Sequence, residues 1–345
     1  MVRSTTFEFN SMRALVCHEY GTPDVLKLEK NWPEPALPPG HVRIATRVSG
    51  VSFAVVLGIA GKHQNKPGLP YIPSGEAAGI VLEVAPGVTH VKPGDRVTAL
   101  AQRGGGIAEQ FVAPAETVWK IPDGLDDAQA MIVAGTHGSV FLALEWSARL
   151  QKGETLLVHG AGGGSGLSAV MLGHAMGARV IGTASSEEKR AAAKAAGADL
   201  LIDSRNEDLR TRVLELTGDR GVDVVFDPVG GDIFDQSLRC VAPEARLICY
   251  GFASGRIPQI PANILLVKNI TAIGYYWGYY LGWGRQMPPP QNFVRLRQTM
   301  SMLMQWAAEG KLPQMPVTRF AVDDFRAALR MVEDREAIGK IVLEF

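Results

Sequence analysis

Five glycines gathered in one short stretch carry the clearest chemical signal of the chain. The stretch follows an apolar β run, Thr155–His159, and precedes a helix-period segment of small residues, Leu167–Gly177. Glycine lets the backbone turn sharply and lets a pyrophosphate approach it, while a helix N-terminus offers free N–H groups and a positive dipole end. With a second strand over Arg179–Thr183, the pattern predicts a dinucleotide-binding βαβ unit. The residues expected to hold the cofactor here are Gly160, Ala161, Gly163, Gly164, Ser165 and Gly166.

The spacing of these glycines differs from the usual dinucleotide pattern. Gly160, Gly163 and Gly166 recur every third residue, so a strict G-x-G-x-x-G cannot be placed on the turn. Glycines alone would also suit a flexible loop. The flanking strands and the following helix are what favour the dinucleotide interpretation.

The end of the second strand indicates which dinucleotide is bound. A site that prefers NAD usually has Asp or Glu there, to accept from the ribose 2′-hydroxyl. This chain has Ser185, followed one helical turn later by Lys189. Because a 2′-phosphate needs donors and positive charge, we expect NADPH, with Ser185 and Lys189 as its partners. In the alternative, Ser185 or Ser186 is only a helix N-cap, Lys189 is a solvated lysine, and Glu187 and Glu188 are first-turn acids.

The composition predicts a two-domain globular protein. The chain has 345 residues, of which 46% are hydrophobic and 20% charged. Lys+Arg and Asp+Glu are equal at 35 each, so we expect neither a nucleic acid nor a membrane surface as partner. No signal-peptide pattern opens the sequence and no apolar run reaches membrane-spanning length, which favours the cytoplasm. Cys17, Cys240 and Cys249 form no C-x-x-C, which argues against a disulfide framework or a cysteine zinc site.

The first third of the chain reads as a β-rich, barrel-like domain. Short apolar runs alternate with Gly and Pro turns between residues 12 and 118. We expect strands over residues 12–17, 25–28, 41–51, 79–84, 96–100 and 109–112.

Helical periodicity begins at Asp126 and leads into the dinucleotide unit. Helices are expected over Ala128–Val133 and Gly138–Trp146, and later over Phe293–Glu309 and 322–330. Together these elements predict an α/β protein, with an N-terminal β-rich domain and a Rossmann domain built on a doubly wound parallel sheet. The expected divisions are residues 1–11 for an extension, 12–134 with 306–345 for the β-rich domain, and 135–305 for the nucleotide-binding domain.

Several short motifs occur together over nearly all of residues 12–345. They are LPYIPSGEAAG at 69–79, GDRV at 94–97, GGIAE at 105–109, LVHGAGG at 157–163, DVVFDPVGG at 223–231 and GKIVL at 339–343. In this set the chain resembles the medium-chain dehydrogenase/reductases, and within them the zinc-free NADPH:quinone oxidoreductases. The resemblance implies a GroES-like N-terminal domain, an NADPH cofactor and a homodimer.

The resemblance also bears on metal chemistry. The zinc-dependent alcohol dehydrogenases of the superfamily carry a catalytic Cys and a His at positions that match Ser52 and Gly75 here. A catalytic zinc keeps three protein ligands, so the loss of two argues against zinc-assisted alcohol oxidation. We expect no metal.

The same resemblance implies the residues beside the nicotinamide. Thr136 and Ser139 lie in a segment that matches one lying against it, and Gly251 and Phe252 match its flanking turn. His63 replaces a tyrosine of the family, and its ordinary pKa suits proton donation near neutrality. The catalytic candidates are therefore His63 and Ser139. Thr136 and Ser139 would equally serve as helix caps, and His63 as a surface loop residue.

Other positions depart from the family pattern or complete the expected site. Ser52 replaces the family's asparagine, and Ser204 replaces an aromatic residue often near the 2′-phosphate, with Arg205 beside it as a substitute partner. Tyr276 and Trp277 belong to an aromatic run that suits either a flat substrate pocket or a subunit interface. The remaining expected contacts are Ser204, Arg205 and Val229 for the cofactor, and Ser52, Tyr276 and Trp277 for the substrate.

These features predict NADPH-dependent, zinc-independent hydride transfer to a quinone or another electron-poor acceptor conjugated to a carbonyl. The partner is then a small hydrophobic molecule, and the protein supplies orientation and charge stabilisation. One alternative is an enone or enoyl reductase for a specialised substrate, although no cluster of Lys and Arg stands out for a long acyl-thioester. Another is an NADPH-binding sensor or structural protein with little turnover.

Overall fold

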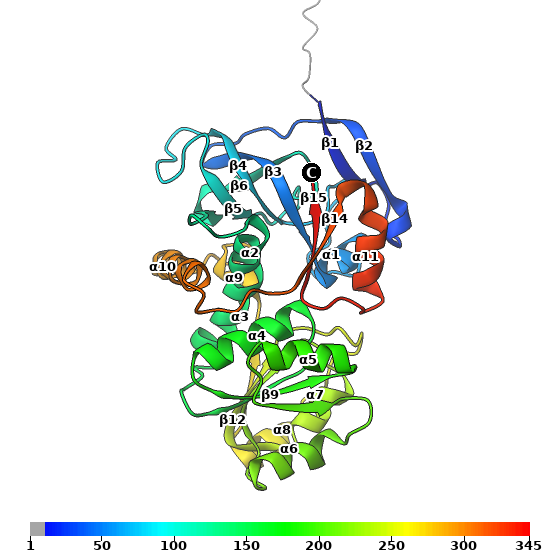
Figure 1. The fold of residues 1–345 in the computed structure, drawn as a ribbon, viewed down its shortest axis with the longest axis vertical. Helices are drawn as coiled ribbons and strands as arrows, with labels where there is room; N and C mark the ends of the chain where they lie inside the picture. The colour runs from blue at the N-terminus through cyan, green and yellow to red at the C-terminus, as the bar shows by residue number, and fades with distance from the viewer. Residues whose placement is uncertain (1–10) are drawn as a thin grey trace, which may run out of the picture.

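The computed structural model describes residues 11–345, and it has two lobes that meet at a narrow waist (Figure 1). One lobe is built on a seven-stranded sheet with a two-stranded sheet beside it, and the other on a six-stranded parallel sheet. This confirms the predicted α/β class with a β-rich domain and a Rossmann domain. The predicted extension lies outside the described residues except for Ser11, where β1 begins.

The parallel sheet has the doubly wound order β10-β9-β8-β11-β12-β13. The strand order reverses between β8 and β11, and ligands of such sheets bind at the carboxyl ends of the strands at this point. All six strands run parallel and most of their side chains are buried, as expected for a sheet covered by helices. The strands are β8 (Thr155–Val158), β9 (Arg179–Ala184), β10 (Leu200–Asp203), β11 (Val222–Asp227), β12 (Val241–Cys249) and β13 (Thr271–Gly274). The helices are α4 (Gly164–Ala175), α5 (Glu187–Ala195), α6 (Leu209–Thr217), α7 (Asp232–Ser237) and α8 (Ala262–Lys268).

The β-rich lobe is closed by the C-terminus. The chain returns after the Rossmann domain, and β15 pairs antiparallel with β3 (Figure 1). The strands are β1 (Ser11–Cys17), β2 (Leu26–Pro33), β3 (His41–Val51), β4 (Glu76–Val84), β5 (Arg96–Leu100), β6 (Gln110–Pro114), β7 (Val118–Lys120), β14 (Val317–Ala321) and β15 (Lys340–Glu344). The helices are α1 (Phe53–Ile59) and α11 (Phe325–Glu333), with 3-10 turns at Pro23–Val25, Ala115–Thr117 and Val322–Asp324.

One continuous helical run joins the two lobes. It consists of α2 (Asp127–Ile132), a π-helical segment Val133–His137, α3 (Gly138–Phe141) and a second π-helical segment Leu142–Ser147. The sequence prediction of two helices with a break before Gly138 was wrong. Gly135 lies within the first π-helical segment and Gly138 begins α3, and π-helical turns are often found at functional sites. Beside this run lie α9 (Trp277–Tyr280) and α10 (Pro290–Ala308) (Figure 1).

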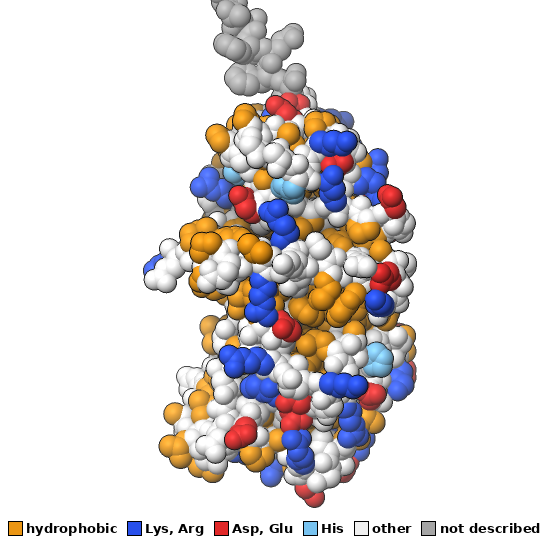
Figure 2. Space-filling view, turned by 90° about the vertical axis from the view of Figure 1, so that its left-hand side faces the viewer, with side chains coloured by type: hydrophobic (Ala, Val, Ile, Leu, Met, Phe, Trp, Pro, Cys, Tyr) orange, Lys and Arg blue, Asp and Glu red, His pale blue; other side chains and the backbone are white. Residues whose placement is uncertain are grey.

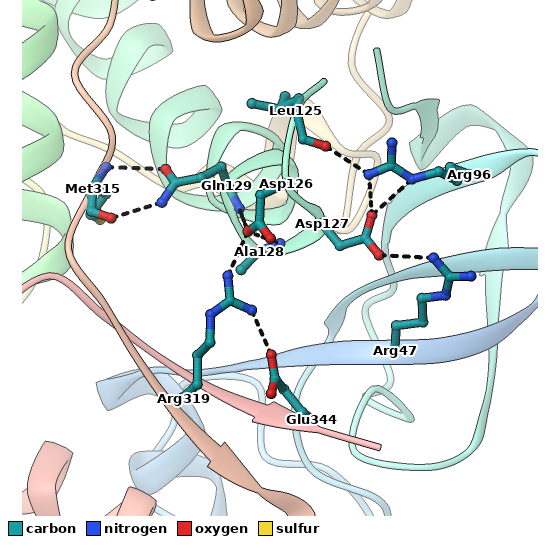
Figure 3. Close-up of polar contacts among 10 residues, drawn as sticks. All are labelled: Arg47, Arg96, Leu125, Asp126, Asp127, Ala128, Gln129, Met315, Arg319 and Glu344. Carbon is teal, nitrogen blue, oxygen red and sulfur yellow. Dashed lines mark hydrogen bonds and ion pairs between the residues drawn. The ribbon is translucent and has the colours of Figure 1, made fainter. Parts of the chain in front are cut away.

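A polar network fixes the N-terminus of this helical run (Figure 3). The Asp126 carboxylate caps α2 by accepting from the N–H groups of the first turn, and it also accepts from Arg319, whose other guanidinium nitrogen binds Glu344. The buried amide of Gln129 donates to the Met315 carbonyl over 2.8 Å and accepts from the Met315 N–H over 3.1 Å. Residues from the C-terminal return therefore hold the helix that leads into the site.

A second set of contacts ties the same helix to the β-rich lobe (Figure 3). Asp127 receives two hydrogen bonds from Arg96 at 2.6 and 3.2 Å, and it lies 3.6 Å from an Arg47 nitrogen. Arg96 also donates to the Leu125 carbonyl. Hydrophobic side chains gather around the waist between the lobes, whereas charged side chains are spread above and below it (Figure 2).

Within residues 11–345, none of the helices combines the length and apolarity that a membrane span requires.

Candidate functional site

The glycine turn lies at the carboxyl end of β8, at the switch point of the sheet. Gly160 has a φ of +61°, in the left-handed region that glycine adopts without strain. A Cβ at Gly166 would overlap the carbonyl of Gly160, so this position admits only glycine in this backbone. Two of the predicted glycines are thus required by the geometry of the turn.

Helix α4 begins directly at this turn. Its N-cap is Gly163, and no side chain caps it. The first intrahelical bond runs from the Leu167 N–H to the Gly163 carbonyl, so the N–H groups of Gly164, Ser165 and Gly166 have no partner within the helix. Free N–H groups and the positive end of a 12-residue helix dipole form a site suited to a pyrophosphate. This fits the bridging phosphates of a dinucleotide.

The C-terminal return crosses the glycine turn (Figure 1). The Gly339 N–H donates to the Gly162 carbonyl over 3.1 Å, and Gly339 forms a parallel bridge with Gly163. The next residue, Lys340, is buried and forms an ion pair with Glu76 of β4. The segment around Gly339 therefore connects the nucleotide-binding turn to the β-rich lobe.

Near the carboxyl end of β9, the charges of two arginines act on the ammonium of Lys189. Burial, the charge of Arg205 and the charge of Arg335 all lower the pKa of Lys189, opposed by Glu336. The Lys189 ammonium donates to the Arg335 carbonyl, and the Arg335 guanidinium donates to the Ala253 carbonyl over 2.7 Å. Like charges held together destabilise one another, and an anion between them relieves this. The arrangement fits the 2′-phosphate of NADPH.

The two serines before α5 have different roles. Ser186 is the N-cap and accepts from the Lys189 N–H, so the alternative of a capping serine applies to Ser186. Ser185 is partly exposed, and none of the hydrogen bonds found among residues 11–345 involves its hydroxyl. The acid that ends β10, Asp203, is engaged by Arg190 over 3.0 Å and by the Arg205 N–H. Ser204 and Arg205 are exposed at the end of that strand.

Arg335 was missed by the sequence analysis. It lies 146 residues after Lys189, in the return between α11 and β15, and its φ of +60° places it in a tight turn. No local pattern links it to the Rossmann domain. The only available signal was its nearness in sequence to the Gly339 motif.

The turns after β11 and β12 pack against each other beside the glycine turn. Asp227 is fully buried and accepts from the N–H groups of Val229 and Gly230 at 2.7 and 2.9 Å, which fixes the first turn. Gly251 lies against Pro228, and the Ala253 N–H donates to the Pro228 carbonyl. Val229, Gly251 and Phe252 are all partly exposed, at the edge of the sheet where the sequence placed them.

The π-helical segment and α3 bring Thr136 and Ser139 to the same region. Ser139 is buried, and its hydroxyl lies 2.8 Å from that of Tyr250, the residue that follows β12. His137 between them is buried and bonds Ser168 of α4 over 2.7 Å, and burial lowers its pKa to about 4. His137 is therefore a neutral core residue, while Thr136 is partly exposed.

His63 lies on a loop after α1 that reaches the aromatic run. The Asn65 N–H lies 3.1 Å from the Nδ1 of His63, and the Asn65 amide donates to the Tyr276 hydroxyl over 2.6 Å. Tyr276 is 43% exposed, while Trp277 packs against the large core cluster. Ser52 is the partly exposed N-cap of α1 and makes no side-chain cap bond. The structure thus brings His63 to the segment of Tyr276, and shows no direct contact of His63 with Ser139.

Small residues stand at the two positions, Ser52 and Gly75, that match zinc ligands of the zinc-dependent alcohol dehydrogenases. A Cβ at Gly75 would overlap the backbone carbonyl of Ala101, so this backbone leaves no room for a histidine there. Across residues 11–345, no three His, Cys, Asp or Glu side chains gather as a metal site requires. The ammonium of Lys340, with a side chain only 6% exposed, is the cation that lies against Glu76.

Comparison with known proteins agrees with this architecture. The alcohol dehydrogenase GroES-like domain family matches residues 38–123, and the zinc-binding dehydrogenase family matches residues 164–289. The first match falls on the β-rich lobe, and the second on the Rossmann domain from the start of α4 onward.

Full-length relatives identify the family. A quinone oxidoreductase-like protein 2 homolog from Nematostella vectensis is 40% identical over 96% of this chain and 89% of its own. Quinone oxidoreductase from Pseudomonas syringae superposes with a TM-score of 0.88 at 31% identity, covering 97% of this chain and all of that one. The Escherichia coli quinone oxidoreductase complexed with NADPH has a TM-score of 0.83 at 27% identity, covering 97% and 99%. The chain belongs to the quinone oxidoreductase family of the medium-chain dehydrogenase/reductases, and it is an oxidoreductase.

Proposed function

We propose that the protein catalyses NADPH-dependent, zinc-independent hydride transfer to a quinone or another electron-poor acceptor conjugated to a carbonyl. The observation that carries this proposal is that Lys189 lies against Gly162 of the glycine turn, binds the Arg335 carbonyl, and has its pKa lowered by the charges of Arg205 and Arg335. This charge cluster matches the 2′-phosphate, the group that distinguishes NADPH from NADH. The Escherichia coli relative in complex with NADPH supports the same cofactor.

The proposal of zinc independence rests on residues of the β-rich lobe. Ser52 and Gly75 stand where the zinc-dependent alcohol dehydrogenases have a Cys and a His that bind zinc. The close approach of Gly75 to the Ala101 carbonyl excludes a side chain at position 75. The ion pair of buried Lys340 with partly buried Glu76 neutralises the acid that follows Gly75. A carboxylate shielded from water requires such a partner, and here the chain supplies it from its C-terminal return.

The residues of the chain bind, orient and stabilise the reactants in this proposal. The first turn of α4 would hold the pyrophosphate, and the cations near β9 would hold the 2′-phosphate. When bound, NADPH supplies the hydride. Negative charge then develops on the acceptor oxygen, and hydrogen-bond donors aimed at that oxygen lower the barrier most. The hydroxyl of Ser139 and the imidazole of His63 are the proposed donors.

The test is NADPH oxidation by purified protein treated with a chelator, with a naphthoquinone and a small neutral enone as separate acceptors. The proposal expects NADPH-dependent reduction of the quinone that the chelator does not change. Loss of activity on chelation, with recovery on adding zinc, would overturn zinc independence. Tight NADPH binding without turnover of either acceptor would instead favour a sensing role.

A second candidate, reduction of an acidic enone or enoyl substrate, is favoured by one cavity. A cavity of about 1050 Å³ lies beside the loop of His63, and its lining includes Lys66 and Arg103 but no Asp or Glu. The hydrogen bond between Asn65 and Tyr276 places the Rossmann domain close to this loop. The sequence showed no cationic cluster because Lys66 and Arg103 are far apart in the chain.

This candidate predicts that a carboxylate on the acceptor improves binding. Arg103→Gln should raise the KM for an enone carrying a carboxylate several-fold, and leave the KM for its neutral ester unchanged. Arg239→Gln, in the other lobe, is the matched charge control. Equal KM values for the acid and the ester in the wild-type protein would rule out this candidate.

We also propose a homodimer located in the cytoplasm. Within the described residues, β13 pairs only with β12, and the neighbouring α8 buries none of its residues, with Leu266 77% and Val267 76% exposed. An open sheet edge beside exposed apolar residues suits pairing with a second copy. Light scattering should give twice the monomer mass, and Val267→Glu should reduce it. The three free cysteines fit a reducing compartment.

A further inference from the structure

The hydroxyl of Tyr250 contacts Ser139, a residue that the proposed function places in the site. Tyr250 follows β12 at the carboxyl edge of the parallel sheet, directly before Gly251. Its hydroxyl lies 2.8 Å from that of Ser139 in α3. One phenol therefore connects the end of β12, beside the nucleotide-binding turn, with the helical run from the β-rich lobe.

The ring of Tyr250 packs against two other aromatic rings. It stacks on Tyr275 with ring centroids 5.6 Å apart and planes inclined by 10°, and it packs on Phe226 of β11 at 4.6 Å. Tyr275 in turn donates from its hydroxyl to the backbone carbonyl of Ser139 over 2.6 Å. Tyr250 thus hydrogen-bonds the side chain of Ser139, and Tyr275 hydrogen-bonds its backbone. Such packing locks the rotamer of a supporting residue.

We propose that Tyr250 is a positioning residue of this enzyme, which orients the hydroxyl of Ser139 toward the bound nicotinamide dinucleotide. The inference rests on the proposed NADPH-dependent function. Tyr250 acts through Ser139. A serine hydroxyl rotates freely unless a partner fixes it, and a fixed hydroxyl loses less entropy when it binds.

The protonation of the phenol is consistent with this role. Burial raises the pKa of Tyr250, and the neighbouring hydroxyls of Ser139 and Ser165 only partly oppose this. The hydroxyl therefore stays protonated across the physiological range and keeps its donor. Either hydroxyl of the Tyr250–Ser139 pair can be the donor, so the bond fixes the Ser139 hydroxyl in both arrangements.

The test is a double-mutant cycle on cofactor binding, measured by titrating the protein with NADPH and with NADH and following nicotinamide fluorescence. Tyr250→Phe removes the hydroxyl and keeps the stacked ring. We expect both dissociation constants to rise by about fivefold, as for the loss of one hydrogen bond. Ser139→Ala should have a similar effect, and the double variant should be no worse than either single variant. Tyr280→Phe, in the same aromatic stack, is the matched control and should bind as the wild type does.

The binding and stability of these variants decide whether Tyr250 positions Ser139. Unchanged binding by Tyr250→Phe, or effects of the two substitutions that multiply in the double variant, would overturn it. A purely structural role would lower the melting temperature of Tyr250→Phe and Tyr280→Phe alike without coupling to Ser139. If the wild-type protein binds neither nucleotide, the proposed function itself fails, which is a separate outcome from intact binding in Tyr250→Phe.

Discussion

Replacement of Arg335 by glutamine tests how the protein selects its cofactor. The guanidinium of Arg335 reaches from the C-terminal return to the loop of Ala253, and its charge acts on Lys189. Because Lys189 binds the backbone carbonyl of Arg335, the substitution keeps that contact and removes only the side-chain charge. We therefore expect NADPH to bind more weakly and NADH to be little affected.

The magnitude follows from the exposure of the side chain. A hydrogen bond to a charged group contributes about 1.5–3 kcal/mol, and solvent screening favours the lower end for an exposed residue such as Arg335. A loss of about 1.4 kcal/mol is a factor of about ten, so kcat/KM for NADPH should fall about tenfold. Lys189→Gln should cost more, because Lys189 is the more buried of the two cations.

The assay compares initial rates with NADPH and NADH at one quinone concentration. Arg330→Gln is the matched control, because Arg330 lies nearby in the chain but pairs with Asp24 over 2.8 Å. A control variant with wild-type selectivity is expected. Equal losses with NADPH and NADH in Arg335→Gln would show that Arg335 only orders the loop of Ala253, and would refute the 2′-phosphate assignment.

Three further substitutions test the fold and the site. Gly166→Ala should abolish measurable NADPH binding, because the added Cβ overlaps the Gly160 carbonyl; binding within twofold of the wild type would contradict the turn geometry. His137 has a pKa of about 4 in the folded protein against 6.5 unfolded, so the unfolded state binds more protons between these values and stability falls by up to about 3 kcal/mol as pH drops through this window. In urea denaturation, His137→Asn should reduce the difference in the free energy of unfolding between pH 7 and pH 5. An unchanged difference would assign the loss of stability to other groups. Gln129→Leu leaves the N–H and the carbonyl of Met315 without their hydrogen-bond partner and should lower the free energy of unfolding by about 2–4 kcal/mol. A loss under about 0.5 kcal/mol would mean that water replaces the amide.

The fold could be predicted from the sequence wherever a local pattern carries the information. The strand β3 has the predicted bounds, and the glycine turn lies between the predicted strand and helix, because both depend on neighbouring residues. The short helix α8 was missed because none of its residues is buried, so it shows no apolar period. The break predicted before Gly138 was wrong because helix packing against Met300 and α4 outweighs glycine's low helix propensity.

The site was predictable only in part, since its residues come from distant segments. Lys189 could be predicted from its spacing to Ser185. Arg335 is contributed to the site by the C-terminal return, and Tyr250 by the end of β12. Their roles depend on which segments lie side by side, and periodicity does not encode this. Gly75 was recognised only as a missing ligand. The structure adds that its backbone approaches Ala101 too closely for any side chain.

The central claim is that the cation cluster beside an intact glycine turn makes this protein an NADPH-dependent, metal-free reductase. The most direct test is the ratio of kcat/KM for NADPH to that for NADH, measured with chelator-treated protein and a naphthoquinone. The account predicts a ratio well above ten and no change when zinc is added. A ratio near one, or activity that appears only with zinc, would contradict it.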